Sequence, residues 1–153
     1  MLWGCMSAKG VGYSCRINGC MDSALYCEIL GGEFEFLQTI EYYGFEAEDI
    51  VFQQDNDTKH TSTSAKKWFV DNGIEVLQWP PQSPDLNLIE HLWHYLKMNL
   101  NSYETEPSSI HELWTRVEME WNEISVDKCM ELIDSMVDRV SAVLKAKSGY
   151  TKY

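Results

Sequence analysis

Two acidic residues, Asp55 and Glu90, have the type and spacing of a two-carboxylate metal site. Asp55 follows the apolar run at residues 50–52, which is typical of a buried strand, and Glu90 lies in a segment whose apolar spacing predicts a helix. The 34 residues at positions 56–89 allow the strand end and the helix to converge at the carboxyl edge of a sheet, where α/β folds place their ligands. Carboxylate oxygens are the protein ligands that Mg²⁺ prefers.

Both acids also have ordinary structural explanations. Asp-Asn-Asp at 55–57 is a common loop composition after a strand, so Asp55 and Asp57 fit a turn. Glu90 fits a solvated helical carboxylate that pairs with His94 one turn later. Spacing alone leaves these alternatives open.

The segments around the two acids resemble the catalytic-domain signatures of Tc/mariner superfamily transposases. They read QQDNDTKHTS at 53–62 and WPPQSPDLNLIEHLW at 79–93, and the resemblance extends from LWGC at 2–5 to GYTKY at 149–153. It implies an α/β, ribonuclease H-like fold, a mixed sheet flanked by helices with extra C-terminal helices, in a single DDE-type catalytic domain over residues 1–153. Thr58 and Leu88 stand where the family usually has proline, and Pro81 where it more often has serine, so the loops are expected to be less rigid.

The resemblance implies a role for each residue near the acids. Asp55 and Glu90 would be the catalytic residues and the ligands of Mg²⁺ or Mn²⁺, with two ions expected in an intact family member. Lys59 and His60 are candidates for contact with a DNA phosphate, with a solvated loop as the alternative. Asp85 is a candidate for orienting Glu90, and capping of the same helix is its plainer role.

The resemblance also implies that parts of the family's domain do not occur in this sequence. In the family a third carboxylate, an Asp, lies on a first strand upstream of the LWGC segment, and a basic helix-turn-helix region reads transposon ends. By resemblance, the first strand is the centre of the sheet, between the strands at 2–7 and 50–54. We therefore expect an N-terminally truncated catalytic domain that binds metal weakly, whose two flanking strands keep unpaired edges or meet directly.

The charge of the chain limits how it can bind DNA. Its formal net charge is −12, and residues 17–58 contain ten acidic residues and no Lys or Arg. Because Lys and Arg supply most non-specific affinity for DNA, contacts must come from a few local groups. The basic residues nearest the predicted site are Lys59, Lys66, Lys67 and Lys97.

Two main functions compete. The first is metal-dependent DNA cleavage and strand transfer at transposon ends, as in DNA transposition and integration. The protein would act in the nucleus, as a homodimer or as a heterodimer with intact transposase. Because the catalytic domain is expected to be truncated, this chain is predicted to be inactive. The alternative is a non-catalytic remnant that dimerises with intact transposase and inhibits it. A nuclease of the same fold that uses other acids is a third hypothesis.

The five cysteines, at 5, 15, 20, 27 and 129, form an odd set without a C-x-x-C pair, which favours reduced thiols in an intracellular protein. A zinc site from the first four remains an alternative, although their spacing is irregular. No apolar run approaches the roughly 18 residues that span a bilayer, so no membrane segment is predicted.

Apolar periodicity, caps and turn residues predict the order β-β-α-β-α-β-α-α-α. The expected elements are a hairpin of strands 2–7 and 11–17, a helix capped by Asp22 or Ser23 and interrupted at 31–32, a strand at 50–54, a helix through 65–69 that Gly73 ends, a strand at 74–79, a helix starting at Asp85, and two helices over 110–124 and 126–143. The six tryptophans are assigned to core packing.

Overall fold

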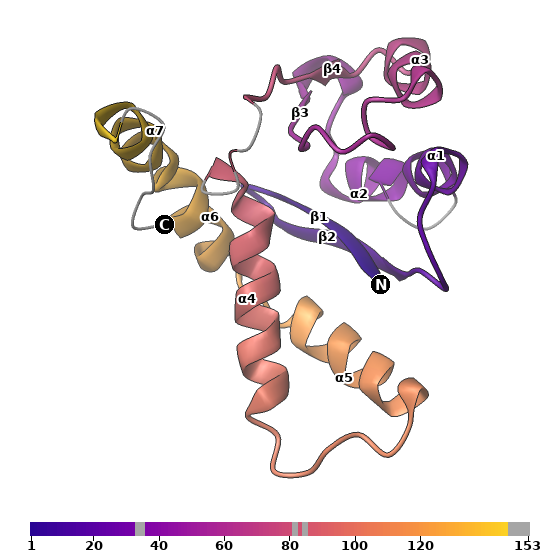
Figure 1. Ribbon diagram of the computed structural model, residues 1–153, viewed down its shortest axis with the longest axis vertical. Helices are drawn as coiled ribbons and strands as arrows, with labels where there is room; N and C mark the ends of the chain where they lie inside the picture. Colours follow the sequence, from indigo (N-terminus) through magenta and orange to yellow (C-terminus); the bar gives the residue numbers. More distant parts are fainter. Residues whose placement is uncertain (33–35, 81–82, 84–85, 147–153) are drawn as a thin grey trace. The chain divides into compact units, whose positions relative to one another are not determined.

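The computed structural model describes residues 1–32, 36–80, 83 and 86–146 (Figure 1). The chain divides into two compact units. The first contains residues 1–5 and 12–83, and the second contains residues 6–11 and 84–153.

The chain begins with a hairpin of strands β1 (Leu2–Ser7) and β2 (Gly10–Arg16). At the turn, the Lys9 N–H donates to Ser7 Oγ at 3.1 Å, and the Ser7 hydroxyl donates to the Gly10 carbonyl at 3.4 Å. Gly10 has a φ of 129°, which a residue with a side chain rarely adopts. The predicted hairpin is therefore confirmed.

Two helices follow the hairpin in the first unit, α1 (Ser23–Gly31) and α2 (Phe36–Tyr43). The Asp22 side chain caps α1 by accepting from the Leu25 N–H, and Gly32 ends it with extended backbone, as the sequence predicts. A Cβ on Gly31 would lie 2.9 Å from Trp68 Nε1, so this glycine permits close packing of α1 on α3 (Thr63–Asp71).

The second pair of strands, β3 (Val51–Phe52) and β4 (Glu75–Val76), is parallel and flanks α3, after a short 3₁₀ helix η1 (Ala47–Asp49). Both strands are shorter than the predicted ranges of 50–54 and 74–79. Side chains bond the segments beyond them instead: Gln54 bonds to His60, and the Asn56 amide donates to the Trp79 carbonyl at 2.9 Å. The Leu77 N–H also donates to the Phe52 carbonyl at 2.9 Å, next to the end of β4.

The strands form two separate two-stranded sheets, β1–β2 and β3–β4 (Figure 1). Within the described ranges, β1 and β3 do not pair with each other. Of the two outcomes expected for these strands, direct pairing is therefore wrong. The other, that each keeps an unpaired edge, agrees with the two separate sheets.

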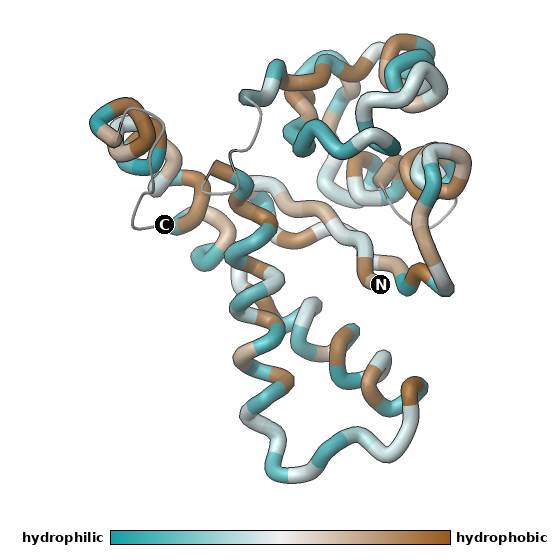
Figure 2. The backbone as a smooth tube through the Cα atoms, in the orientation of Figure 1, coloured by the Kyte–Doolittle hydropathy of each residue, from teal (hydrophilic) through white to brown (hydrophobic). Residues whose placement is uncertain are grey.

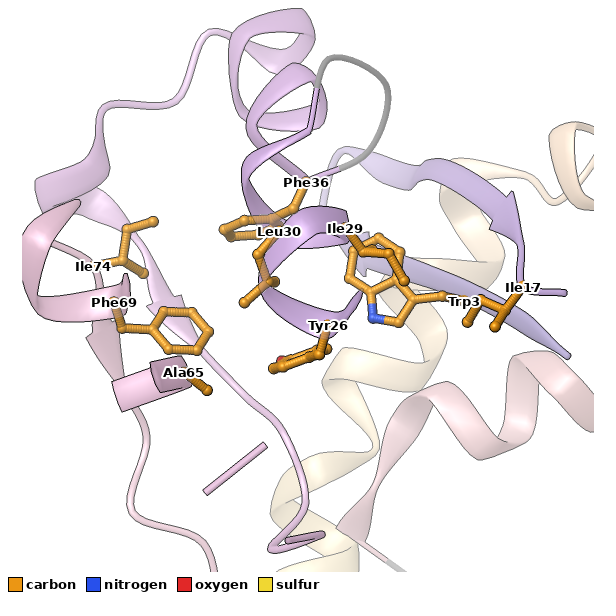
Figure 3. Packing of buried hydrophobic residues seen from close by; sticks show 9 residues of the cluster. All are labelled: Trp3, Ile17, Tyr26, Ile29, Leu30, Phe36, Ala65, Phe69 and Ile74. Carbon is orange, nitrogen blue, oxygen red and sulfur yellow. The ribbon is translucent and has the colours of Figure 1, made fainter. Parts of the chain in front are cut away.

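Apolar side chains from both sheets and three helices form the core of the first unit (Figure 3). Tyr26 and Leu30 of α1 lie in the middle, between Phe69 of α3 on one side and Trp3 of β1 on the other. The cluster comprises Trp3, Ile17, Tyr26, Ile29, Leu30, Phe36, Ala65, Phe69 and Ile74. Burial of this apolar surface is the main stabilising term that the unit has.

The described part of the second unit contains four helices, and hydrophobic and hydrophilic residues alternate along them (Figure 2). These are α4 (Leu88–Asn101), α5 (Ile110–Asn122), α6 (Val126–Asp134) and α7 (Met136–Lys145). α4 packs on α5 and α6, and the rings of Trp93 and Trp121 stack with centroids 4.9 Å apart. The assignment to core packing is confirmed for Trp121, which is fully buried, whereas Trp93 is half-buried.

The prediction of one helix over 126–143 is wrong, because Ser135 divides it into α6 and α7. The Ser135 N–H donates to the Glu131 carbonyl and its hydroxyl donates to the Leu132 carbonyl at 2.6 Å, which closes the last turn of α6. None of the helices that the structure describes is both long enough and apolar enough to cross a bilayer.

Candidate metal centre

The loop after β3 presents Asp55 at the carboxyl end of that strand, as the sequence predicts. Its Oδ1 accepts from the Asp57 N–H at 3.1 Å and lies 2.6 Å from His60 Nδ1. The Asp55 side chain is 51% exposed. In the described part of the chain its Oδ2 makes no hydrogen bond. One carboxylate oxygen is thus fixed by the protein, and the other is available to a cation.

Asp57 has the turn role that its loop composition indicates. Its Oδ1 accepts from the Lys59 N–H at 3.1 Å, and its Oδ2 is paired with the Lys59 ammonium. The hydrogen bonds from Lys59 hold the pKa of the Asp57 carboxyl below its ordinary value. Asp57 is therefore bound to its own loop, and Lys59 already has an anionic partner.

His60 lies against the core of the first unit. The His60 side chain is 16% exposed, and its ring centroid is 4.4 Å from that of Tyr26. Gln54 connects the same residues: its amide donates to the His60 carbonyl at 3.3 Å, and its Oε1 accepts from the Tyr26 hydroxyl. Tyr26 lies in the helix that the sequence predicts after Asp22, and no local signal indicated its contact with this loop.

Glu90 lies in the first turn of α4, with an exposed side chain. The next residue, His91, anchors this turn, because His91 Nε2 lies 2.7 Å from Nη1 of the buried Arg139 on α7. A guanidinium can only donate, so His91 accepts through Nε2. Arg139 Nε also donates to Ser135 Oγ at 2.8 Å. The sequence did not indicate this support from α7.

The predicted helix start at Asp85 is wrong, since α4 begins at Leu88. Asn87 precedes it with φ −80° and ψ 96°, an extended conformation that prevents an earlier helical turn from continuing into α4. Asp85 itself lies outside the described residues, so its role in orienting Glu90 stays a prediction.

Asp55 belongs to the first unit and Glu90 to the second, so their convergence on one site also stays a prediction. Among the described residues, no three His, Cys, Asp or Glu side chains lie close enough together to hold a metal ion. Burial raises the pKa of the Cys5 thiol to about 11, and Cys5 donates to Thr39 Oγ1.

Comparison with known proteins identifies the family. Residues 4–114 match the family of DDE superfamily endonucleases. The whole chain is 37% identical to the transposase of transposable element Tcb1 of Caenorhabditis briggsae and 37% identical to that of Tc1 of Caenorhabditis elegans. It covers 54% of each, so it spans about half the length of these relatives.

Solved structures show the fold. The catalytic domain of Mos1 mariner transposase superposes with a TM-score of 0.85 at 17% identity, covering 99% of this chain and 75% of that one. The Mos1 catalytic domain with Raltegravir and Mn superposes with a TM-score of 0.83 at 17% identity, over 99% and 76% of the two chains. The chain belongs to the DDE superfamily endonucleases and resembles the Tc/mariner transposases among them, with a ribonuclease H-like fold.

Proposed function

We propose that this chain is part of a transposase that cuts and joins DNA with divalent metal ions, and that Asp55 and Glu90 are its metal ligands. The geometry of Asp55 carries the proposal. Its carboxylate stands at the end of β3, half exposed, with Oδ1 held by the Asp57 N–H and His60 and with Oδ2 available. This is a suitable donor for Mg²⁺ or Mn²⁺.

The chemistry divides between the ions and the side chains. Two bound ions would activate the attacking hydroxyl and stabilise the leaving alkoxide of a phosphodiester. Asp55 would supply one oxygen ligand from a loop anchored on α1, and Glu90 would supply another from the first turn of α4, which Arg139 holds through His91. The role of this chain is to hold the two carboxylates in place.

The proposed substrate is the DNA of transposon ends, which one homologous Mos1 transposase structure contains in a paired-end complex. Lys59 remains the proposed phosphate contact in the loop, and His60 is the weaker candidate because its Nδ1 already contacts Asp55. Lys59 would have to exchange Asp57 for a phosphate, because its ammonium is already paired. With a formal net charge of −12, the chain needs further basic segments or a partner to bind DNA tightly.

The proposed setting is the nucleus, with the chain as a homodimer or as a heterodimer with intact transposase, and with both units forming one catalytic domain. The alternative is a non-catalytic remnant that inhibits intact transposase. The net charge of −12 favours the alternative, since it opposes autonomous DNA binding.

A nicking and strand-transfer assay with purified chain, Mn²⁺ and transposon-end DNA tests the proposal. We expect that any activity is lost in Asp55→Asn and in Glu90→Gln. The control variants Asp71→Asn and Glu131→Gln remove exposed acids that form ion pairs with Lys67 and Lys128 on their own helices, and they should keep the activity. Activity that survives loss of Asp55 or Glu90 would refute the assignment. A wild-type chain that does not cut DNA but blocks intact transposase would favour the inhibitory remnant.

A further inference from the structure

We propose that His60 is a positioning residue that holds the Asp55 carboxylate in its metal-binding orientation, and that Tyr26 on α1 fixes His60 in turn. This inference rests on the proposed function, because it assumes that Asp55 is a metal ligand. It gives His60 a role other than contact with DNA, and it adds a residue from a different helix to the site.

The contact between His60 and Asp55 determines where the imidazole proton lies. His60 Nδ1 is 2.6 Å from Asp55 Oδ1, and an ionised carboxylate only accepts hydrogen bonds. Nδ1 therefore carries the proton and donates it. Because the bond involves a charged acceptor, it is of the stronger kind. With the Asp57 N–H on the same oxygen, it fixes the rotation of the carboxylate and directs metal binding to Oδ2.

The difference in burial shows which partner constrains the other. The His60 side chain is 16% exposed, whereas that of Asp55 is 51% exposed. The His60 backbone is fixed as well, since its N–H donates to the Asp57 carbonyl at 3.0 Å and its carbonyl accepts from Gln54. A half-exposed acid is thus held by a ring that has little freedom to move.

Tyr26 connects this ring to the core. Tyr26 is a core residue that is only 1% exposed, its ring lies against His60, and its hydroxyl donates to Gln54 Oε1. Burial, with the negative charge of Asp55 as the next cause, raises the pKa of the Tyr26 phenol far above its ordinary value. The phenol therefore stays protonated and remains a donor. The path runs from α1 through Tyr26 and Gln54 to His60 and Asp55.

Direct contact with DNA explains these observations less well. A phosphate would need an exposed imidazole N–H, but the Nδ1 proton of His60 is already donated to Asp55 and the ring is mostly covered. Partners that orient a metal ligand in this way typically change metal affinity by about 10- to 100-fold when they are removed. We expect a loss in this range for His60→Ala.

The test measures Mn²⁺ affinity by calorimetry and the His60 tautomer by nitrogen NMR in the metal-free chain. His60→Ala should weaken Mn²⁺ binding about 10-fold or more. His60→Asn should restore part of the affinity, because its amide N–H can replace Nδ1–H. Tyr26→Phe keeps the ring but removes the hydroxyl that bonds Gln54, and it should give a smaller loss. The control is His111→Ala, at an exposed position on α5.

The two proposals fail in different ways. If Asp55→Asn abolishes Mn²⁺ binding but His60→Ala changes it less than twofold, the positioning role is wrong and the proposed function stands. An Nε2–H tautomer of His60 in the wild-type chain would also overturn the positioning role. If Mn²⁺ does not bind the wild-type chain in an Asp55-dependent way, the proposed function falls and the positioning role falls with it. Circular dichroism of each variant shows whether a lost affinity reflects unfolding.

Discussion

Gly12→Ala should destabilise the first unit, because β2 passes close to α2 at this position. A Cβ on Gly12 would lie 2.5 Å from Cys5 Sγ and 2.5 Å from Thr39 Cγ2, whereas real Cβ contacts below 3.0 Å essentially do not occur. Gly12 is not among the glycines with positive φ, so backbone strain does not contribute. Space alone requires glycine here.

The size of the effect follows from two opposing terms. Overpacking a filled core costs about 1–3 kcal/mol. Replacing glycine by alanine at a compatible backbone position returns roughly 0.4–1 kcal/mol by restricting the unfolded chain. The close contacts outweigh the entropy gain, so we expect a net loss of about 1–2 kcal/mol. Relief by movement of Thr39 is restricted, because Thr39 Oγ1 also accepts from the Tyr13 N–H at 3.0 Å.

Urea unfolding followed by tryptophan fluorescence measures this loss. A double-mutant cycle supplies the control: in a chain that already carries Cys5→Ala and Thr39→Ala, the atoms that Cβ would meet are gone. There Gly12→Ala should be neutral or stabilising, which gives a coupling energy of about 1–3 kcal/mol. An equal loss in both backgrounds, or stabilisation of the wild-type chain, would refute the steric explanation.

Three further predictions concern the thiols, the break between α6 and α7, and the open sheet edges. At pH 8 the exposed Cys20 should react with iodoacetamide, while the half-buried Cys5, with a pKa of about 11, stays unmodified. Mass spectrometry of the peptides measures both, and equal labelling would contradict the raised pKa of Cys5. Ser135→Ala should lower the free energy of unfolding by about 1–3 kcal/mol, because the buried Arg139 loses an acceptor. The control Ser102→Ala, at an exposed position, should change the free energy of unfolding little. Similar urea midpoints for the two variants would argue against Ser135 as a stabilising acceptor for Arg139. Hydrogen exchange should be rapid for amides at the open edges of β1 and β3, and slow exchange of both the Trp3 and Val51 strands in the isolated monomer would count against the weakness expected there.

Local signals were sufficient to predict most helix ends and the hairpin. Asp22 and Ser62 cap α1 and α3 through bonds to residues three positions later, and Gly73 follows α3 with a φ of 67°. Such caps depend on a few adjacent residues, so the sequence shows them directly. The carboxylate at the end of β3 was predicted in the same way, from an apolar run that ends before an Asp.

Features that depend on distant partners were not predictable from local pattern. Beyond the short strands β3 and β4, Gln54 and Asn56 bond to other segments, and at the break after α6 Ser135 bonds to the preceding turn and to Arg139. Tyr26 lies in a helix that the sequence predicts, yet its hydroxyl and ring face reach a loop that lies far along the chain. Such contacts are properties of the tertiary structure, and residue spacing does not contain them.

The stacked indoles of Trp93 and Trp121 give the second unit an intrinsic optical signal. Two such chromophores with centroids 4.9 Å apart and planes 23° from parallel couple their electronic transitions, which produces a paired circular dichroism band that a single indole lacks. Trp93 lies on the same helix as Glu90, one turn further along, and Trp121 lies on α5. Loss of the band during a titration with metal or DNA would report that the helix bearing Glu90 had separated from its neighbour, without any added label.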